Sequence, residues 1–200
     1  MKKEYEETLK QLSEEDAARL MMLAMHNNDA RSEGSEKLIV PKRRLTDAEQ
    51  TFFSSNFFGT ELFGNSIDFS AVKIARGGIL TITSRFVTIN DTIYVPRKYY
   101  YDDYTRNVLF APIMAHELAH VWQYQNRFKP ALKQYWWFDA FIEQIRIEDP
   151  YEYDPNAHDV LTNYRFEQQG QIIEDYASSL LSGRPNQRLQ KIVKSCIPVL

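Results

Sequence analysis

The chain of 200 residues contains a single cysteine, Cys196. One cysteine excludes an intramolecular disulfide, so the fold cannot depend on an oxidising compartment. A lone thiol can act as a nucleophile, but Cys196 stands close to the C-terminus and to Pro198. We therefore expect this cysteine to have a structural role.

An excess of basic residues is also absent. Lys and Arg number 24 against 27 Asp and Glu, which gives a formal net charge of −3. Binding to nucleic-acid phosphates needs clustered cations, so we expect no nucleic acid as a partner. The basic run Lys42-Arg43-Arg44 is short, and we expect it in a solvated loop.

Long hydrophobic runs are the third absence. A membrane-spanning helix needs about 18 or more consecutive apolar residues, and no segment reaches that length. The first residues, MKKEYEE, are charged where a signal peptide would be apolar. We expect a protein without a membrane span, synthesised in the cytoplasm without a signal peptide. Any export would use a route that needs no such peptide.

The composition that remains is that of a globular protein, with 44% hydrophobic and 14% aromatic residues. We expect two parts. Residues 1–36 form an N-terminal helix (1–26) and a polar, flexible connection (27–36). Residues 37–200 form one folded domain, which is long enough to bury a core.

Capping and turn signals mark the first half of this domain. Thr46-Asp47-Ala48-Glu49 is a capping box, which predicts a short helix that buries Phe52 and Phe53. Apolar and β-branched residues indicate strands at 72–75, 87–89 and 92–95, the last two joined by a turn at Asn90-Asp91. We expect a small antiparallel sheet.

The second half reads as helical. Helices are expected at 105–128, with Pro112 near the start, at 130–148, and at 162–181, where Gly183 and Pro185 end the last one. Residues 149–160 read as a loop. The aromatic clusters at 99–101 and 136–138 are expected in the core. The predicted fold class is α+β, mainly helical, with a small antiparallel sheet or hairpin before the helix at 105–128.

Two histidines in that helix, His116 and His120, are four residues apart. This spacing places both imidazoles on one face, one turn apart, where they can bind one metal ion. Glu117 lies beside them and can act as a general base on a water molecule without ligating the metal. Imidazoles suit zinc, so we expect one Zn²⁺ per chain with a third protein ligand. Gln123 and Asn126 occupy the positions where one class of such enzymes has Gly and a third His, which excludes that class.

The third ligand is expected from the helix at 162–181. Glu167, Gln171 and Glu174 form a polar stripe on one face of that helix. Gly170 lies on the same side, and its missing Cβ would allow the helix to approach the metal helix closely. Glu167 is our first choice of ligand, and Glu174 and His158 are the alternatives.

A hydrolase also needs a donor for the oxyanion that develops on the substrate. Four side chains between the two metal-binding helices are candidates: Tyr151, Tyr153, His158 and Tyr164. We favour Tyr153 or His158 as this catalytic residue. Asp175 and Gln171 are candidates for orienting a ligating imidazole through its other nitrogen.

The motif also resembles a known family. HELAHVWQYQ (116–125), followed by EQQGQIIEDY (167–176), is similar to the zincin metallopeptidase domains attached to type VI secretion spike proteins of the VgrG type and to Rhs-type proteins. The hairpin at 88–94 resembles the strand pair that precedes the metal helix in such domains. The resemblance covers about residues 70–180.

This resemblance implies a zincin fold, zinc bound by His116, His120 and Glu167, and Glu117 as catalytic base. It also implies a peptide or protein substrate and a role as an antibacterial or anti-host effector secreted by the type VI route. The secretion apparatus and an immunity protein would then be its partners.

Two other functions stay open at this stage. A non-catalytic module of the same fold could bind a partner, although a structural metal site has no use for Glu117 beside its ligands. A metal-dependent amidase that cleaves cell-wall peptides would use the same site chemistry as a peptidase, so the sequence cannot separate the two.

Overall fold

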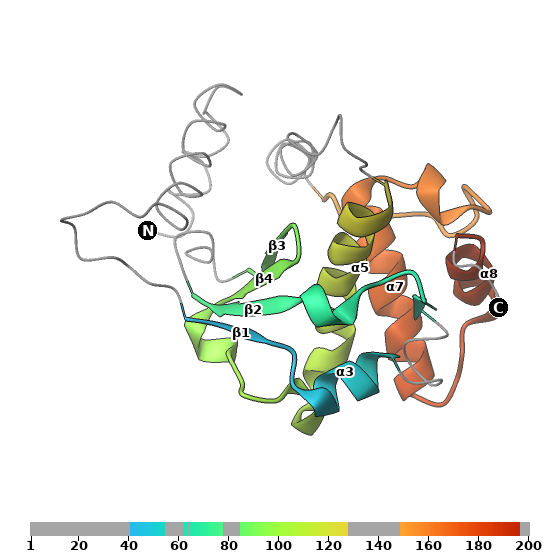
Figure 1. Cartoon of the computed structure of the whole chain (residues 1–200). Coiled ribbons are helices and arrows are strands. Elements are labelled where there is room, and N and C mark those ends of the chain that lie inside the picture. The colour runs from blue at the N-terminus through green and yellow to red at the C-terminus, as the bar shows by residue number, and fades with distance from the viewer. Residues whose placement is uncertain (1–40, 55–61, 64, 78–84, 128–148, 197–200) are drawn as a thin grey trace, which may run out of the picture.

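Two packed helices and a small four-stranded sheet form the frame of the protein (Figure 1). The computed structural model describes residues 41–54, 62–63, 65–77, 85–127 and 149–196. The predicted helices at 1–26 and 130–148, the connection at 27–36 and the aromatic cluster at 136–138 lie outside the described residues. The domain boundary at residue 36 therefore stays a prediction.

The sheet consists of β1 (Lys42–Arg44), β2 (Lys73–Arg76), β3 (Val87–Ile89) and β4 (Thr92–Val95), in the order β1-β2-β4-β3. The predicted hairpin is confirmed: β3 and β4 are antiparallel and joined through Asn90, whose positive φ of 54° asparagine tolerates better than most residues. β2 and β4 run parallel, so the prediction of a wholly antiparallel sheet is wrong for the central pair. The central place beside β2 belongs to β4, the second and more buried strand of the hairpin, and not to β3, which runs in the opposite direction.

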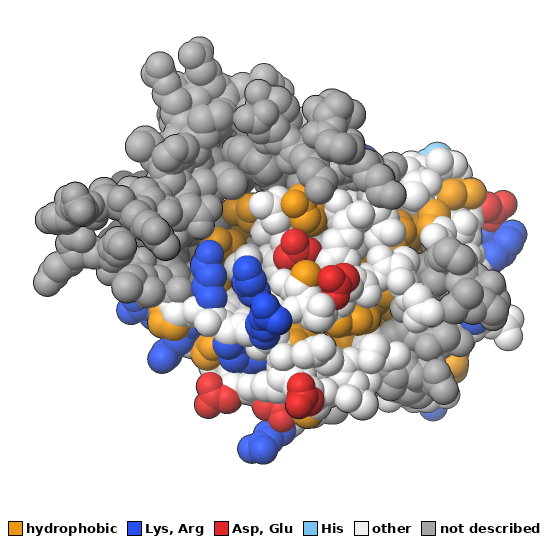
Figure 2. Space-filling view, viewed as in Figure 1, with side chains coloured by type: hydrophobic (Ala, Val, Ile, Leu, Met, Phe, Trp, Pro, Cys, Tyr) orange, Lys and Arg blue, Asp and Glu red, His pale blue; other side chains and the backbone are white. Residues whose placement is uncertain are grey.

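The basic run at 42–44 is the edge strand β1, and the prediction of a solvated loop is wrong. Arg43 turns inward and forms a bidentate salt bridge with Glu49, at 2.6 Å to Oε2 and 2.8 Å to Oε1. Residues 42–44 are held in place by pairing with β2 and by this salt bridge, although their composition alone predicts a solvated loop. The other basic residues of β1 and β2 stay exposed, and Figure 2 shows Lys and Arg side chains gathered over the strands.

The predicted capping box is confirmed at the start of α3 (Asp47–Ser54). The Thr46 N–H donates to Glu49 Oε2 at 2.8 Å, and the Glu49 N–H donates to the Thr46 hydroxyl at 3.1 Å. Phe53 is fully buried, as predicted, and Phe52 is half-buried. Glu49 also accepts the N–H of Tyr104 at 2.9 Å, so one buried carboxylate joins β1, α3 and the segment that leads to the next helix.

The metal-motif helix, α5, spans Ala111–Arg127 and begins later than predicted. Short 3₁₀ turns at Tyr104–Arg106 and Val108–Phe110 precede it. Pro112 explains the difference, because a proline has no N–H to donate one turn back and its ring blocks an extension of the helix in that direction. Pro112 therefore lies in the first turn of α5, as the sequence predicts.

Helix α7 spans Phe166–Leu181 and ends as predicted at Gly183, whose φ of 69° is left-handed. A further helix, α8 (Gln187–Lys194), was not predicted. Its signal is Asn186, whose side-chain oxygen accepts two N–H groups of the first turn. Cys196 follows α8 half-buried against the core, which agrees with a structural role.

The layers follow the order sheet, α5, α7 and α8 (Figure 1). Their shared core is apolar, and the aromatic cluster at 99–101 packs against it half-buried, as predicted. Fully buried members come from each layer: Ile74, Ile93, Met114, Leu118, Ile172, Tyr176, Ile192 and Val193. The predicted α+β fold class is confirmed. None of the described helices combines the length and apolarity that crossing a membrane requires.

The Arg43–Glu49 pair gives a first testable prediction. Arg43→Ala leaves the Glu49 carboxylate, which is 0% exposed, without its cation, and we expect the free energy of unfolding to fall by about 3–5 kcal/mol. Arg44→Ala, on the same strand but exposed, is the control and should change stability by less than about 0.5 kcal/mol. Denaturant unfolding measures both. Equal stability of the two variants would contradict this account.

Candidate metal centre

Three buried side chains converge between α5 and α7: His116, His120 and Glu167. One ligand atom from each lies within 4.8 Å of the others. Glu167 Oε2 is 3.4 Å from His116 Nε2 and 3.6 Å from His120 Nε2. Exposure is 5% for His116, 6% for His120 and 2% for Glu167. Of the three candidates for the third ligand, Glu167 is the one that the structure brings to both histidines.

Gly170 makes this convergence sterically feasible. It lies one turn after Glu167 on α7, directly against the imidazole of His116. A Cβ at this position would be 2.7 Å from His116 Nε2 and 2.8 Å from Cε1, closer than real Cβ atoms come to other heavy atoms. The predicted role of Gly170 in close helix approach agrees with this geometry.

The outer nitrogen of each imidazole has its own acceptor. His116 Nδ1 lies 3.1 Å from Glu174 Oε2, and His120 Nδ1 lies 2.8 Å from Gln123 Oε1. Since both partners can accept a proton, the Nδ1 atoms are the donors in these contacts, and the Nε2 atoms are the ring nitrogens that face Glu167. Glu174 thus contacts the outer nitrogen of His116, on the side of the ring away from Glu167.

The orientation of the Gln123 amide follows from its other contacts. Its Nε2 donates to the Phe166 carbonyl at 3.1 Å and to Gln169 Oε1 at 3.0 Å, which turns its oxygen toward His120. Gln169 in turn donates to the Tyr164 carbonyl at 2.6 Å. The contact of Gln123 with His120 was not predicted, although the position of Gln123 three residues after His120 on the same helix is a signal for it.

The two residues predicted to orient an imidazole have other partners. Gln171 donates to Asp175 at 2.9 Å, and Asp175 also accepts the Tyr153 hydroxyl at 2.6 Å. This network fixes the segment after residue 149 on α7. It makes no hydrogen bond to His116 or His120 within the described residues.

Electrostatics favour a cation at the point of convergence. Burial lowers the pKa of His116, but the hydrogen bonds to Glu167 and Glu174 outweigh it and raise the pKa to about 10. Burial raises the pKa of Glu167, yet the neighbouring His120 and His116 hold it well below its usual range. Both shifts have one physical meaning, because a buried carboxylate stabilises positive charge next to it.

Glu117 lies beside the three ligand candidates, with 6% of its surface exposed. Its Oε2 accepts the Thr88 hydroxyl of β3 at 2.6 Å. Burial raises the pKa of this carboxyl group, and the nearby histidines and Thr88 act in the opposite direction. On balance the pKa of Glu117 stays above its usual value, because burial is the largest of these effects.

The two favoured oxyanion donors do not contact the three ligand candidates. Tyr153 donates to Asp175. His158 is exposed, its ring lies 5.0 Å from that of Tyr164, and its carbonyl accepts from Arg188 near α8. The tyrosine beside the histidines is Tyr151, whose ring centroid is 5.8 Å from that of His116. Residue spacing could not separate Tyr151 from Tyr153, because the choice depends on how the loop folds back.

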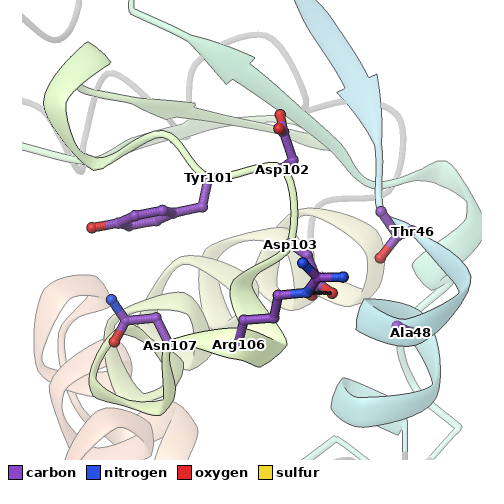
Figure 3. A pocket seen from close by; sticks show the side chains of 7 residues that line it. All are labelled: Thr46, Ala48, Tyr101, Asp102, Asp103, Arg106 and Asn107. Carbon is purple, nitrogen blue, oxygen red and sulfur yellow. Dashed lines mark ion pairs between the residues drawn. The ribbon is translucent and has the colours of Figure 1, made fainter.

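A separate pocket of about 670 Å³ lies between the start of α3 and the segment that precedes α5 (Figure 3). An ion pair of 3.4 Å between Asp103 and Arg106 crosses one wall. The lining residues are Thr46, Ala48, Tyr101, Asp102, Asp103, Arg106 and Asn107. None of the ligand candidates lines this pocket, so we do not assign the chemistry to it.

The donor set fits a metal ion. Two imidazole nitrogens and one carboxylate are the ligands of many catalytic zinc sites, and the outer-nitrogen partners described above are typical of them. His116, His120 and Glu167 can therefore hold a metal ion.

Gly170 gives the second prediction. Gly170→Ala should displace the His116 imidazole and lower the affinity for Zn²⁺ by about 10- to 100-fold, as disturbing an orienting contact does. Ser178→Ala, exposed on the same helix, is the control and should bind zinc like the parent. Competition with a chromogenic chelator measures both affinities. Unchanged affinity in Gly170→Ala would show that the helices have room to separate.

The chain is similar in fold to a solved structure. No protein-family profile matches the chain, and no curated protein sequence does. Among solved structures, the chain is similar to the effector domain of Pseudomonas aeruginosa VgrG2b, with a TM-score of 0.59 and 20% sequence identity. The similarity covers 89% of this chain and 92% of that chain. The protein thus shares its fold with this effector domain.

Proposed function

We propose that the protein is a zinc-dependent metallopeptidase that hydrolyses a peptide or amide bond. The observation that carries this proposal is the buried convergence of His116, His120 and Glu167, with a second carboxylate, that of Glu117, beside them. One Zn²⁺ per chain at this point would supply a Lewis acid and lower the pKa of a water molecule to about 7. A structural metal site would have no need of the fourth, acidic side chain.

Glu117 is the proposed general base. Its Oε2 is engaged by Thr88, and Oε1 makes no hydrogen bond within the described residues. Oε1 can therefore accept a proton from a water molecule and pass it to the leaving amine. Burial strengthens this role, because a carboxylate with a raised pKa is a better proton acceptor near neutral pH.

Tyr151 is the proposed oxyanion donor, in place of Tyr153 and His158. Its neighbours are anchored: the Tyr151 and Glu152 N–H groups donate to Asp149 at 3.0 and 3.2 Å, and the Glu152 carbonyl accepts from Gln168 at 2.7 Å. The Tyr151 hydroxyl has no hydrogen-bond partner in the described part of the chain. Burial and the charge of Glu167 raise its pKa, so it remains a protonated donor at neutral pH.

The biological setting is proposed from the VgrG2b similarity. A shared fold with that effector domain supports a role as an antibacterial or anti-host effector delivered by the type VI route. The partners would be a peptide or protein substrate, the secretion apparatus and an immunity protein. A cell-wall amidase would use the same residues, and a partner-binding module would need none of the proton-transfer groups.

Glu117→Gln tests the catalytic role. The substitution preserves the size of the side chain, so zinc content should stay near one per chain while hydrolysis falls by about 10²- to 10⁴-fold. Metal analysis and cleavage assays on both an unfolded protein and cell-wall peptides measure this and separate peptidase from amidase. Removal of zinc from the parent with a chelator, followed by zinc addition, is the control. Zinc in both proteins with no hydrolysis by either would favour the binding module.

Tyr151→Phe tests the proposed donor. Loss of one oxyanion donor should lower kcat by about 10²-fold, with KM and zinc content near those of the parent. Tyr153→Phe is the matched control: it removes the bond to Asp175, which should cost about 1 kcal/mol of stability and change kcat little. A larger loss of kcat in Tyr153→Phe than in Tyr151→Phe would reverse the assignment.

A further inference from the structure

We infer that Thr88 is a positioning residue, which holds the Glu117 carboxylate in one orientation. One carboxylate oxygen accepts the Thr88 hydroxyl, and the other is turned toward the water molecule that attacks the substrate. This inference rests on the proposed function. Thr88 lies in β3, and its hydroxyl reaches across to α5, so it links the sheet to the reacting group. It is 9% exposed, and Glu117 is 6% exposed, so the contact is largely shielded from water.

The sheet register determines which side chain of β3 faces Glu117. Thr88 pairs with Ile93 on β4, and Ile93 pairs with Ile74 on β2. Ile93 and Ile74 are fully buried in the core beneath α5, so this row points toward the helix. Thr88 is thus a polar side chain that continues an apolar row, at the position next to Glu117.

The neighbouring residues of β3 face the other way. Ile89 and Val87 pack in a separate cluster with Ala75 and Tyr94. A shift by one residue would place an aliphatic side chain against Glu117. Register therefore places a hydroxyl, rather than a methyl group, beside the carboxylate.

The hydroxyl has two acceptors within reach, and geometry selects the carboxylate. Thr88 Oγ1 is 2.6 Å from Glu117 Oε2 but 3.4 Å from the Glu117 backbone carbonyl. A threonine that only satisfied its own polar group in the core would need the carbonyl alone. The short bond instead fixes the rotation of the carboxylate, and a donor to an ionised carboxylate is about twice as strong as one between neutral groups.

Two substitutions separate the hydroxyl from the shape of the side chain. Thr88→Val keeps the β-branched volume and removes the donor, whereas Thr88→Ser keeps the donor. Thr92→Val is the control, because Thr92 lies in the same hairpin but pairs with Ile89, on the face turned away from Glu117. Each variant is made in the parent and in Glu117→Gln, loaded with zinc, and compared for kcat, KM and zinc content.

We expect Thr88→Val to lower kcat by about 10- to 100-fold, with KM within about twofold of the parent and equal zinc content. Thr88→Ser should recover most of this loss. In the Glu117→Gln background Thr88→Val should have no further effect, because both changes remove the same function. A stable, zinc-loaded Thr88→Val with the kcat of the parent, or an equal loss in both backgrounds, would overturn the inference.

A second probe keeps this result separate from the proposed function. Acetohydroxamate binds zinc and carries an acidic proton that a neighbouring carboxylate can accept, so its affinity reports on Glu117 without a substrate. We expect Thr88→Val to weaken its binding by about 5- to 20-fold and Thr88→Ser to leave it within about twofold. A parent that binds no zinc contradicts the proposed function, which metal analysis shows before any variant is compared. A zinc-loaded parent whose hydroxamate affinity equals that of Thr88→Val contradicts the positioning role alone.

Discussion

The rest of the candidate site depends on the distance between α5 and α7. A catalytic zinc site has three protein ligands, so the two imidazoles of α5 need a third ligand from elsewhere. Glu167 reaches them because Gly170 presents no side chain to His116. The same proximity allows Glu174 and the Gln123–Gln169 pair to bridge the helices at the outer nitrogens. Apolar packing holds the helices together, and the single missing Cβ sets how close they come.

Local geometry explains what the sequence predicts well. The placement of His116 and His120 on one face follows from helix periodicity, the proximity of Glu167 from the stripe it shares with Gly170, and the β3–β4 hairpin from its turn. These features depend on residues within a few positions of each other.

Contacts between residues that are distant in the chain explain the features that the sequence predicts poorly. The parallel β2–β4 pair, the strand at 42–44 and the position of Tyr151 beside His116 depend on contacts between residues distant in sequence, as in the bond between Tyr104 and Glu49 across 55 positions. Pairing of this kind leaves no periodic signal. The residue types near the motif indicate which side chains could contribute to the candidate site, and the tertiary fold determines which of them lie close to it.

The division of the ligand set between two helices has a consequence for the chain before it folds. His116 and His120 belong to one segment and Glu167 to another, so an extended polypeptide offers a histidine pair and a distant acid but no three-point binding site. If the three side chains bind a metal ion as proposed, metal binding and folding are thermodynamically coupled, because the ion then stabilises the native state that brings its ligands together.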